Sequence, residues 1–395
     1  MSNLVTSRNQ IIPTVARSIA AAAALCCAGL ASAQSSVTVY GIVDAAVMYT
    51  TNQQLAAGKP ATGSKTVLDA GQLATSRWGF KGTEDLGGGL KANFALESTL
   101  ANDTGAGGSS YGGGFVQAGT TASLFDRIST VGLSGGFGSV NLGRQNMLGV
   151  DSIGLADPIG LADAPNNPNV VYSALNGGAF GGGYGTNGGG TELRQNNSIK
   201  YVSPVMSGFI GAAMYGFGEQ PGNTAASSYA AVSGVFTDGK SGIALAYAKL
   251  KDATDASSLT LIGGGAKYVM SPVTFNATYA QSKVDGTSAS ATATNRKIAV
   301  TGLGVDYALS PALTLTGAYY NTKQSGSVLG DGKADQFIAM GKYALSKRTI
   351  AYASLTYVKA GSATIPDQMM SAGFIGAGSD SSTATRTAVG ILHSF

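Results

Sequence analysis

Apolar and polar side chains alternate along most of the chain, in segments of about ten residues separated by turn-forming residues. In the first segment Val37, Val39 and Val43 share one parity, whereas Tyr40 and Asp44 belong to the other. A period of two residues is typical of a β-strand that presents one apolar face. The pattern therefore predicts a strand near residue 37 and a chain built largely of strands.

The same alternation recurs in pairs of segments joined by tight turns, as in β-hairpins. After the first strand we predict a pair that begins at Ser76 and Leu90, six further pairs and one final strand, sixteen strands in all. The six pairs cover residues 124–134 and 139–145, 198–203 and 208–218, 229–237 and 241–250, 259–270 and 273–283, 297–309 and 312–323, and 336–345 and 349–359, and the last strand covers 385–395.

Connections between the predicted strands alternate in length. Tight turns join the two strands of each pair, whereas longer segments rich in Gly, Ser, Thr, Asn and Asp join one pair to the next. Examples of the longer segments are 51–70, 101–120, 284–296, 324–334 and 361–384. Short turns at one end and long loops at the other are typical of an outer-membrane β-barrel.

Two other all-β folds also fit parts of the pattern. A soluble antiparallel sandwich would alternate in the same way, and a glycine-rich β-helix would explain the 58 glycines. The outward parity is nevertheless rich in Ala, Val, Leu and Tyr, which suit lipid, and no strand shows the continuous apolar run of a large soluble core. A closed sheet leaves no unpaired edge in a membrane. We therefore predict a sixteen-stranded antiparallel transmembrane β-barrel.

The longest irregular stretch runs from residue 146 to residue 194 and is rich in glycine and proline. A structureless loop of that length is uncommon in a compact domain and is usually functional. Because strands are predicted on both sides, we expect this stretch to fold into the mouth of the barrel and to constrict the pore.

The N-terminal 33 residues have the features of a signal peptide. Arg8 and Arg17 precede an apolar run that is too short to span a bilayer, although an anchor helix is the alternative. Ala31-Ser32-Ala33 matches a cleavage site, so residues 34–395 would form one mature barrel domain that lacks both Cys26 and Cys27. Cleavage lowers the net charge from +4 to +2, because two arginines and no acids are lost.

No set of catalytic, metal-binding or nucleic-acid-binding residues is apparent. The single histidine, His393, shares the outward parity of Ile391 and Phe395, so we expect an interfacial ring and no catalytic triad. The spacing of Cys, His and acidic residues fits neither a zinc site nor a calcium loop. No basic run is interleaved with aromatic residues, so nucleic acid is not an expected partner. We therefore expect neither an enzyme nor a cofactor.

Basic residues are predicted on the inner parity of several strands. Arg127 and Ser129 stand opposite Ile128, for example. An arginine on the lipid face costs roughly 2–4 kcal/mol at the bilayer midplane, so these side chains should face water. The predicted basic pore-lining residues are Arg77, Lys81, Lys91, Arg127, Arg194 and Lys200.

The long loop supplies the acids that would oppose these bases, namely Asp151, Asp157, Asp163 and Glu192. Opposed charges across a narrow lumen set up a transverse field and influence ion preference. The alternative is that the acids are ordinary solvated loop residues, and that Asp157, which precedes Pro158, initiates a turn.

Several short motifs resemble the general diffusion porins of Gram-negative outer membranes. They are Val39-Tyr40-Gly41-Ile42-Val43-Asp44, the run from Ser76 to Gly87, the run from Gly132 to Gly138 with Leu142-Gly143-Arg144-Gln145, Asn196-Asn197-Ser198-Ile199-Lys200-Tyr201, and the terminal Phe395. The resemblance implies a homotrimer in contact with outer-membrane lipids and lipopolysaccharide, and a third external loop that folds inward. It also places a basic wall cluster on Arg77, Arg127 and Arg194, and makes Phe395 the signal for the outer-membrane assembly machinery.

The chain departs from the enteric members of that family at two places. Ile42 stands where they carry a lysine, with Asp44 two residues on, and the loop lacks their Pro-Glu-Phe-Gly motif. The preference for anions or cations therefore stays open. The leading hypothesis is passive diffusion of ions and small hydrophilic solutes through a water-filled pore. The alternatives are a channel selective for one sugar or anion and, from another class, an adhesin or barrel enzyme.

Overall fold

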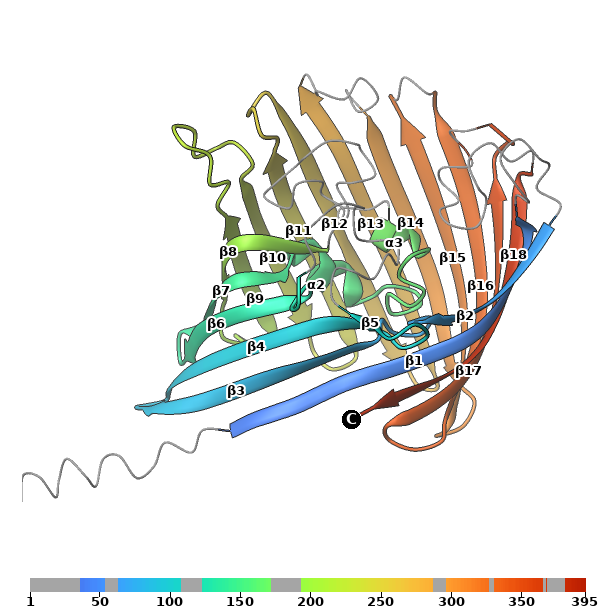
Figure 1. Ribbon diagram of the computed structural model, residues 1–395, viewed down its shortest axis with the longest axis horizontal. Helices are drawn as coiled ribbons and strands as arrows, with labels where there is room; N and C mark the ends of the chain where they lie inside the picture. The colour runs from blue at the N-terminus through green and yellow to red at the C-terminus, as the bar shows by residue number, and fades with distance from the viewer. Residues whose placement is uncertain are drawn as a thin grey trace, which may run out of the picture.

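The structure is a computed structural model that describes residues 36–53, 63–107, 123–171, 193–286, 296–326, 330–364, 367 and 381–395. Its strands form one antiparallel sheet that closes on itself as a barrel (Figure 1). The strands are β1 (Ser36–Gln53), β2 (Gly63–Ala70), β3 (Arg77–Gly87), β4 (Leu90–Ala101), β5 (Ala106–Gly107), β6 (Ile128–Gly135), β7 (Gly138–Asn146), β8 (Arg194–Val202), β9 (Phe209–Gly216), β10 (Tyr229–Thr237), β11 (Ser241–Lys251), β12 (Ser257–Met270), β13 (Val273–Gly286), β14 (Lys297–Ala308), β15 (Leu313–Ser325), β16 (Gly332–Ala344), β17 (Thr349–Ala360) and β18 (Thr383–Ser394).

These strands occupy sixteen positions around the barrel. β2 and β3 lie end to end along β1, since β3 pairs with its first part and β2 with its last part. The two-residue β5 pairs with β4 alone. β1 also pairs with β18 and closes the ring. The predicted sixteen-stranded antiparallel barrel is therefore confirmed, and neither a sandwich nor a β-helix fits this pairing.

The prediction that residues 51–70 form a loop is wrong over Gly63–Ala70, which is β2. The barrel strand made of β2 and β3 is interrupted at residues 71–76, and Asp44 of β1 stabilises the interruption. The fully buried Asp44 carboxylate accepts hydrogen bonds from the backbone N–H groups of Leu73 and Ala74, at 2.6 and 2.8 Å. A carboxylate can thus replace the ladder partners that a break removes. Because the alternation stops at the break, the sequence pattern did not reveal β2.

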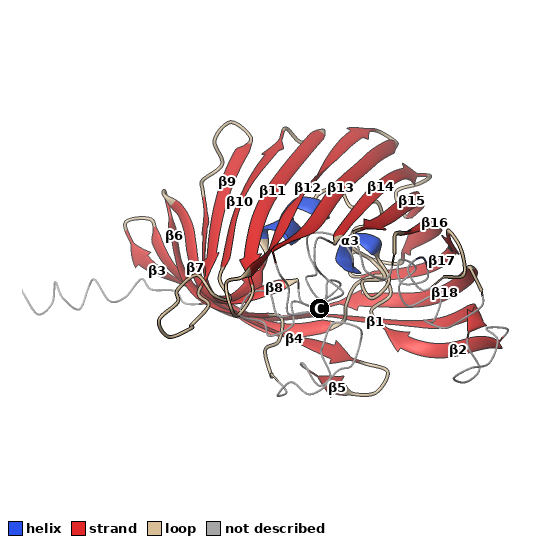
Figure 2. Ribbon diagram, turned by 90° about the horizontal axis from the view of Figure 1, so that it is seen from above, coloured by secondary structure: helices blue, strands red, loops and turns tan. Residues whose placement is uncertain are grey.

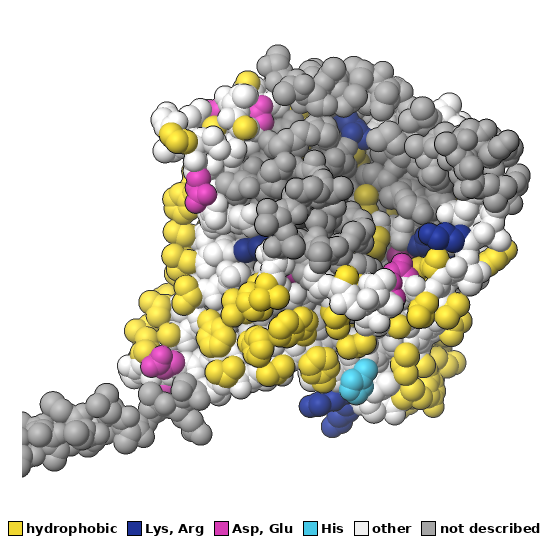
Figure 3. Space-filling view, in the orientation of Figure 1, with side chains coloured by type: hydrophobic (Ala, Val, Ile, Leu, Met, Phe, Trp, Pro, Cys, Tyr) yellow, Lys and Arg dark blue, Asp and Glu magenta, His cyan; other side chains and the backbone are white. Residues whose placement is uncertain are grey.

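The predicted alternation of faces is confirmed on the outer wall. On β11, for example, Leu245 is 65% exposed on the outside while its neighbours Ala244 and Ala246 are buried on the inside. Apolar side chains gather on the outer surface at the level of β1, β3 and β4 (Figure 3). Their exposure fits contact with lipid hydrocarbon.

The helices α2 (Leu148–Gly154) and α3 (Pro168–Val171) belong to the long loop and lie inside the ring of strands (Figure 2). Leu148 and Ile153 of α2 join an apolar cluster with inward side chains of β10 to β16, among them Tyr229 and Leu250. The inner wall is therefore apolar where the loop covers it, which the sequence analysis did not anticipate. No helix in the described residues is long and apolar enough to cross a membrane.

The barrel seam ends at the last residue of the chain. Phe395 exchanges two backbone hydrogen bonds with Gly41 of β1, at 3.1 and 3.3 Å. A side chain at Gly41 would meet the ring of Phe395 and would lie 2.7 Å from the carbonyl oxygen of Arg77. The terminal ring thus packs over a position that only glycine leaves open.

We predict that Gly41→Val lowers the stability of the folded barrel, because the added side chain displaces Phe395 from the seam. Overpacking of this kind costs about 1–3 kcal/mol. The measurement is the urea concentration at which half of the barrel is unfolded, and the folded fraction is read from its heat-modifiable mobility on a gel. Gly234→Val is the matched control, since a Cβ on Gly234 has no atom within 4 Å. Equal midpoints for the two variants would contradict the prediction.

Candidate pore constriction

The long loop leaves β7 at Asn146 and rejoins the wall at Arg194, as predicted, and its residues 147–171 are described. Its first contact with the wall is at β8. Asp151 of α2 forms an ion pair with Lys200, whose ammonium also donates a hydrogen bond to the carbonyl oxygen of Asn146 at 3.2 Å. This contact holds the start of the loop against the wall from which it leaves.

The second contact is buried and centres on Asp157. The Tyr320 hydroxyl of β15 lies 3.0 and 3.1 Å from the two carboxylate oxygens. The Asn169 amide donates to Asp157 at 2.8 Å and to the Thr278 hydroxyl of β13 at 2.9 Å. Burial raises the pKa of Asp157, and the surrounding amide donors oppose that shift. Asp157 thus joins the loop to the wall across the lumen from β8.

The third contact lies at the break between β2 and β3. The backbone N–H of Asp163 donates to the carbonyl oxygen of Gln72 at 2.6 Å, and its carboxylate is 3.6 Å from Nη1 of Arg386 on β18. Burial raises the pKa of Asp163, and the charge of Arg386 opposes that shift. The break therefore supplies a backbone carbonyl to the loop, and the loop spans the lumen from β8 to β18.

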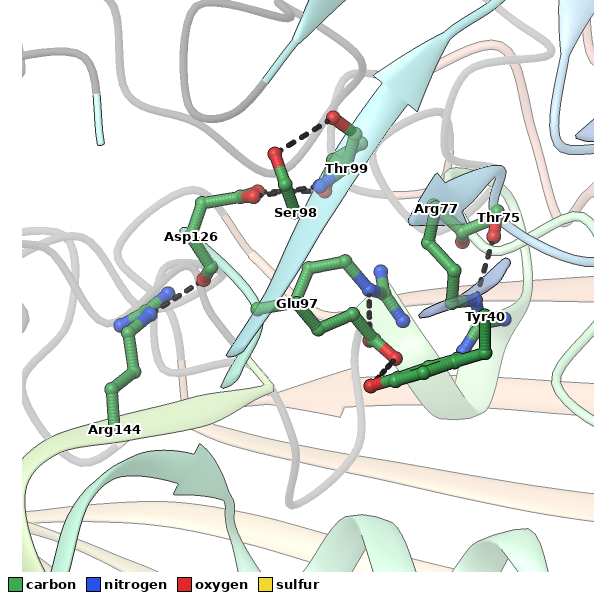
Figure 4. A network of polar contacts seen from close by, with 9 residues as sticks. Tyr40, Thr75, Arg77, Glu97, Ser98, Thr99, Asp126 and Arg144 are labelled. Atoms are coloured by element: carbon green, nitrogen blue, oxygen red, sulfur yellow. Dashed lines mark hydrogen bonds and ion pairs between the residues drawn. The ribbon is translucent and has the colours of Figure 1, made fainter. Parts of the chain in front are cut away.

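Glu97 of β4 lies in a polar network that includes Tyr40 of β1, Arg77 of β3 and Arg127 (Figure 4). Nε of Arg127 lies 2.6 Å from Oε1 of Glu97, and the two side chains are 9% and 7% exposed. Glu97 also interacts electrostatically with Arg77 and Arg194. The Tyr40 hydroxyl donates to the other oxygen of Glu97 at 3.1 Å. Glu97 thus contacts the guanidinium group of Arg127 directly, and Arg77 and Arg194 act on it electrostatically.

Local sequence explains how this cluster is held. A Cβ on Gly79 of β3 would lie 3.1 Å from the Tyr40 hydroxyl oxygen, so the absence of a side chain lets Tyr40 cross β3 to reach Glu97. Lys81 lies over the Tyr40 ring, 5.2 Å from its centre, as in a cation–π contact. Arg77 donates to the carbonyl oxygen of Thr75, within the strand break, at 2.9 Å. The break therefore also positions a guanidinium.

A second acid was not predicted at this site. The Asp126 carboxylate accepts hydrogen bonds from the backbone N–H and the hydroxyl of Thr99, at 2.8 and 2.6 Å. Arg144 donates to the Asp126 carbonyl oxygen and to Asn196, both at 2.5 Å. Asp126 lies within the strand predicted over residues 124–134, but that strand start is wrong, since β6 begins only at Ile128 and strand alternation does not apply to Asp126. Glu97 could have been found, since its inward parity matches that of Lys91.

The reason given for the inward direction of Arg127 is wrong. In β6, Ser129 pairs with Leu96 and shares parity with the exposed Val131, so this parity faces outward. Arg127 precedes the first strand residue, Ile128, and is therefore free of the alternation. Its side chain reaches Glu97 because the backbone there has not yet entered the strand.

The loop acids do not oppose the arginines as the sequence analysis proposed. Asp157 and Asp163 are 4% and 9% exposed and bond the loop to the wall, so the expectation that they face the lumen is wrong. Asp151 is partly exposed but paired with Lys200. Glu192 lies outside the described residues. The acid beside the arginines is instead Glu97, from the wall.

Lys91, the last of the predicted pore-lining bases, and His393, the predicted interfacial ring, lie away from the arginines. Lys91 pairs across from Asp85 and Ser134, next to the short turn after β3, and is exposed. His393 is exposed, and Nδ1 of its ring lies 2.9 Å from the Thr349 hydroxyl. Among the described residues no group of three His, Cys, Asp or Glu side chains could hold a metal ion.

Comparison with known proteins agrees with this architecture. A family model described as Gram-negative porin matches residues 19–363. Outer membrane porin protein 32 of Delftia acidovorans is 32% identical over 96% of this chain and 99% of its own length. Major outer membrane protein P.IB of Neisseria gonorrhoeae is 31% identical over 47% of this chain and 44% of its own length. The chain belongs to the family of Gram-negative porins.

Two solved structures extend the comparison. The anion-selective porin from Comamonas acidovorans is 28% identical, with a TM-score of 0.72 over 92% of this chain and all of its own. A trimer form of OmpT from Vibrio cholerae is 15% identical with a TM-score of 0.61, over 91% of this chain and 99% of its own, and shares the fold. The protein is an outer-membrane porin whose water-filled channel allows passive diffusion of ions and small hydrophilic solutes.

We predict that Tyr320→Phe loosens the loop without weakening the barrel. Loss of the hydroxyl leaves the buried Asp157 carboxylate short of a donor, at a cost of about 1–3 kcal/mol. Single-channel recordings should show more frequent partial closures and a noisier open current than wild type. Tyr319→Phe is the control, because that hydroxyl lies on the outer face and donates to Asp335. A quiet open current in Tyr320→Phe would contradict the anchoring role of Asp157.

Proposed function

We propose that the pore prefers anions and that Arg77, Arg127 and Arg194 set this preference. The observation that carries the proposal is that Arg127 is ion-paired with Glu97 and that Arg77 and Arg194 also interact with this carboxylate electrostatically. Fixed positive charge on a low-dielectric wall raises the local concentration of anions and lowers that of cations. The pore otherwise remains a passive diffusion channel.

The burial of the loop acids supports the same direction. Asp157 and Asp163 bond to the wall, so their carboxylates are not presented to passing ions. Asp151 is balanced by Lys200. The electric field in the lumen then comes mainly from the arginines around Glu97, and it is positive on the side of the barrel formed by β1, β3 and β4. This differs from a balanced field between opposed acidic and basic walls.

We predict that Arg127→Ala shifts the reversal potential in a salt gradient towards cations, because it removes one positive charge and leaves Glu97 with fewer partners. Glu97→Gln should shift the potential towards anions, since the amide oxygen still accepts the Tyr40 hydrogen bond while the negative charge is lost. Arg127 and Glu97 are in direct contact. Opposite shifts of the reversal potential in the two variants would therefore show that the change in charge, and not a change in pore size, is the cause.

Arg348→Ala is the control for that pair of variants. Arg348 lies in the exposed short turn between β16 and β17, so its substitution removes the same charge at a place away from the cluster. Reversal potentials for Arg127→Ala and Arg348→Ala that agree with wild type would place Arg127 outside the ion path and overturn the proposal.

We further propose that three copies assemble in the membrane, that residues 1–33 are a cleaved signal peptide, and that Phe395 is read by the assembly machinery. The trimer form of the Vibrio cholerae fold relative and the exposed apolar outer wall support the first point. We propose a channel without enzymatic activity, since the single histidine, His393, lies on the outer wall bonded to Thr349.

The signal peptide can be tested on the protein extracted from outer membranes. We expect its intact mass to correspond to a chain that begins at Gln34, because Ala31-Ser32-Ala33 fits the cleavage site. A mass that includes residues 1–33 would instead support the anchor helix.

A further inference from the structure

The loop segment of residues 155–158 crosses several strands on the inner face of the barrel. The helix before this segment, α2, contacts β11 and β12, and the helix after it, α3, contacts β14 (Figure 2). The apolar residues of the segment meet the wall at inward glycines of three strands. These four wall glycines are Gly242 of β11, Gly265 of β12, and Gly302 and Gly304 of β14.

Two of the wall glycines belong to one row of cross-strand partners on β11 to β15. In order across the wall, the row consists of Ala244, Gly265, Thr278, Gly302 and Tyr320. Its members are small until Tyr320, whose hydroxyl bonds to Asp157 of the loop. The loop thus follows a row of small inward residues and is bonded to the wall at the first large one.

The contact between loop and wall is closer than a side chain on the wall would permit. A Cβ on Gly304 would lie 2.7 Å from Cβ and 2.9 Å from Cα of Pro158. A Cβ on Gly265 would lie 2.8 Å from Cβ of Ala156, whereas ordinary contacts of a Cβ are 3.4–4 Å long. An alanine at either position would therefore force the loop away from the wall.

Backbone conformation does not account for these glycines. None of the four has the positive φ that side chains disfavour. Glycine inside a strand weakens the strand, and it often marks a place where another backbone approaches closely. At Gly304 the approaching group is the backbone of Pro158 itself, which is buried.

The loop has one direction in which it can yield. The Asp157 carboxylate accepts hydrogen bonds from the backbone N–H groups of Ile159 and Leu161, at 3.1 and 2.7 Å, so the segment is a compact turn. The ion pairs of Asp151 and Asp163 hold the loop to the wall on either side of that turn. Because the wall lies behind it, a turn that is pushed off the wall moves into the lumen.

We propose that Gly265 and Gly304 set the free cross-section of the pore, because they let the loop lie directly against the wall. They are positioning residues, since they contact Ala156 and Pro158 of the loop. A methyl group at either position narrows the pore by displacing the loop. This role concerns the size of the solute. It is independent of the proposed anion preference, which depends on charges near β1, β3 and β4.

Two measurements on the folded protein in lipid test the proposal. Single-channel conductance of Gly265→Ala and of Gly304→Ala should fall about 1.5-fold, because passage depends on pore diameter. In liposome swelling with neutral sugars, uptake of a disaccharide should fall several-fold relative to that of a pentose. The reversal potential in a salt gradient should equal that of wild type, since neither variant alters a charge.

The double variant Gly265→Ala/Ala156→Gly separates positioning from damage to the fold. It moves the methyl group from the loop to the wall and so removes the close contact between the two Cβ atoms. Conductance and the ratio of sugar uptake should return to the wild-type values. A variant that merely loosened the structure would not recover, because a second glycine adds backbone freedom to the loop.

Gly317→Ala is the matched control, because Gly317 is on the outer face of β15 and an added Cβ there has no atom within 4 Å. Its conductance and sugar uptake should equal those of wild type. Wild-type conductance and sugar uptake in both Gly265→Ala and Gly304→Ala would overturn the proposal. So would a wider pore in either variant, or a double variant that stays as narrow as Gly265→Ala. A shifted reversal potential with an unchanged sugar ratio would assign the effect to charge and also overturn it.

Discussion

Every backbone N–H and C=O group of a wall that faces lipid must find a partner within the protein, and the rest of this structure depends on that constraint. The closure of β1 on β18 satisfies it along the seam, down to the bonds between Gly41 and Phe395. The interruption at residues 71–76 would violate it. The carboxylate of Asp44 accepts the backbone N–H groups that the break leaves without ladder partners.

The break is also what connects the wall to the loop. Because residues 71–76 leave the regular ladder, the carbonyl oxygen of Gln72 is available to the backbone N–H of Asp163, and that of Thr75 to Arg77. A regular strand would have used both carbonyls for its neighbours. One buried acid on β1 therefore positions part of the loop and part of the arginine cluster. Asp44 is linked in turn to β17 by the Tyr352 hydroxyl, at 2.6 Å.

Much of the barrel could be predicted from sequence, because period-two alternation and turn length are local properties. The limits 146 and 194 of the long loop followed from the strands on either side. The partners within the site could not be predicted in the same way. The sequence analysis paired the wall arginines with loop acids, whereas Asp157 and Asp163 are buried against Tyr320 and Arg386. Those contacts join segments more than a hundred residues apart, which no local pattern reveals.

Arg127 and the outward-facing lysines Lys323 of β15 and Lys333 of β16 show that strand alternation alone does not fix the direction of every basic side chain. The cost that directs a basic side chain inward is roughly 2–4 kcal/mol at the membrane midplane but falls to about 0–1 near the interfaces. At the ends of strands, the parity of a lysine is therefore not constrained by the membrane, and its long stem can carry the ammonium group to the aqueous edge. This explains why Lys323 and Lys333 face outward at the long-loop end. Arg77, on the inner parity of β3, lies in the central part of the wall, where the membrane does impose a direction. Basic side chains thus face the lumen in the central zone of the barrel and can face outward near its ends. The position of the residue along the strand determines the direction.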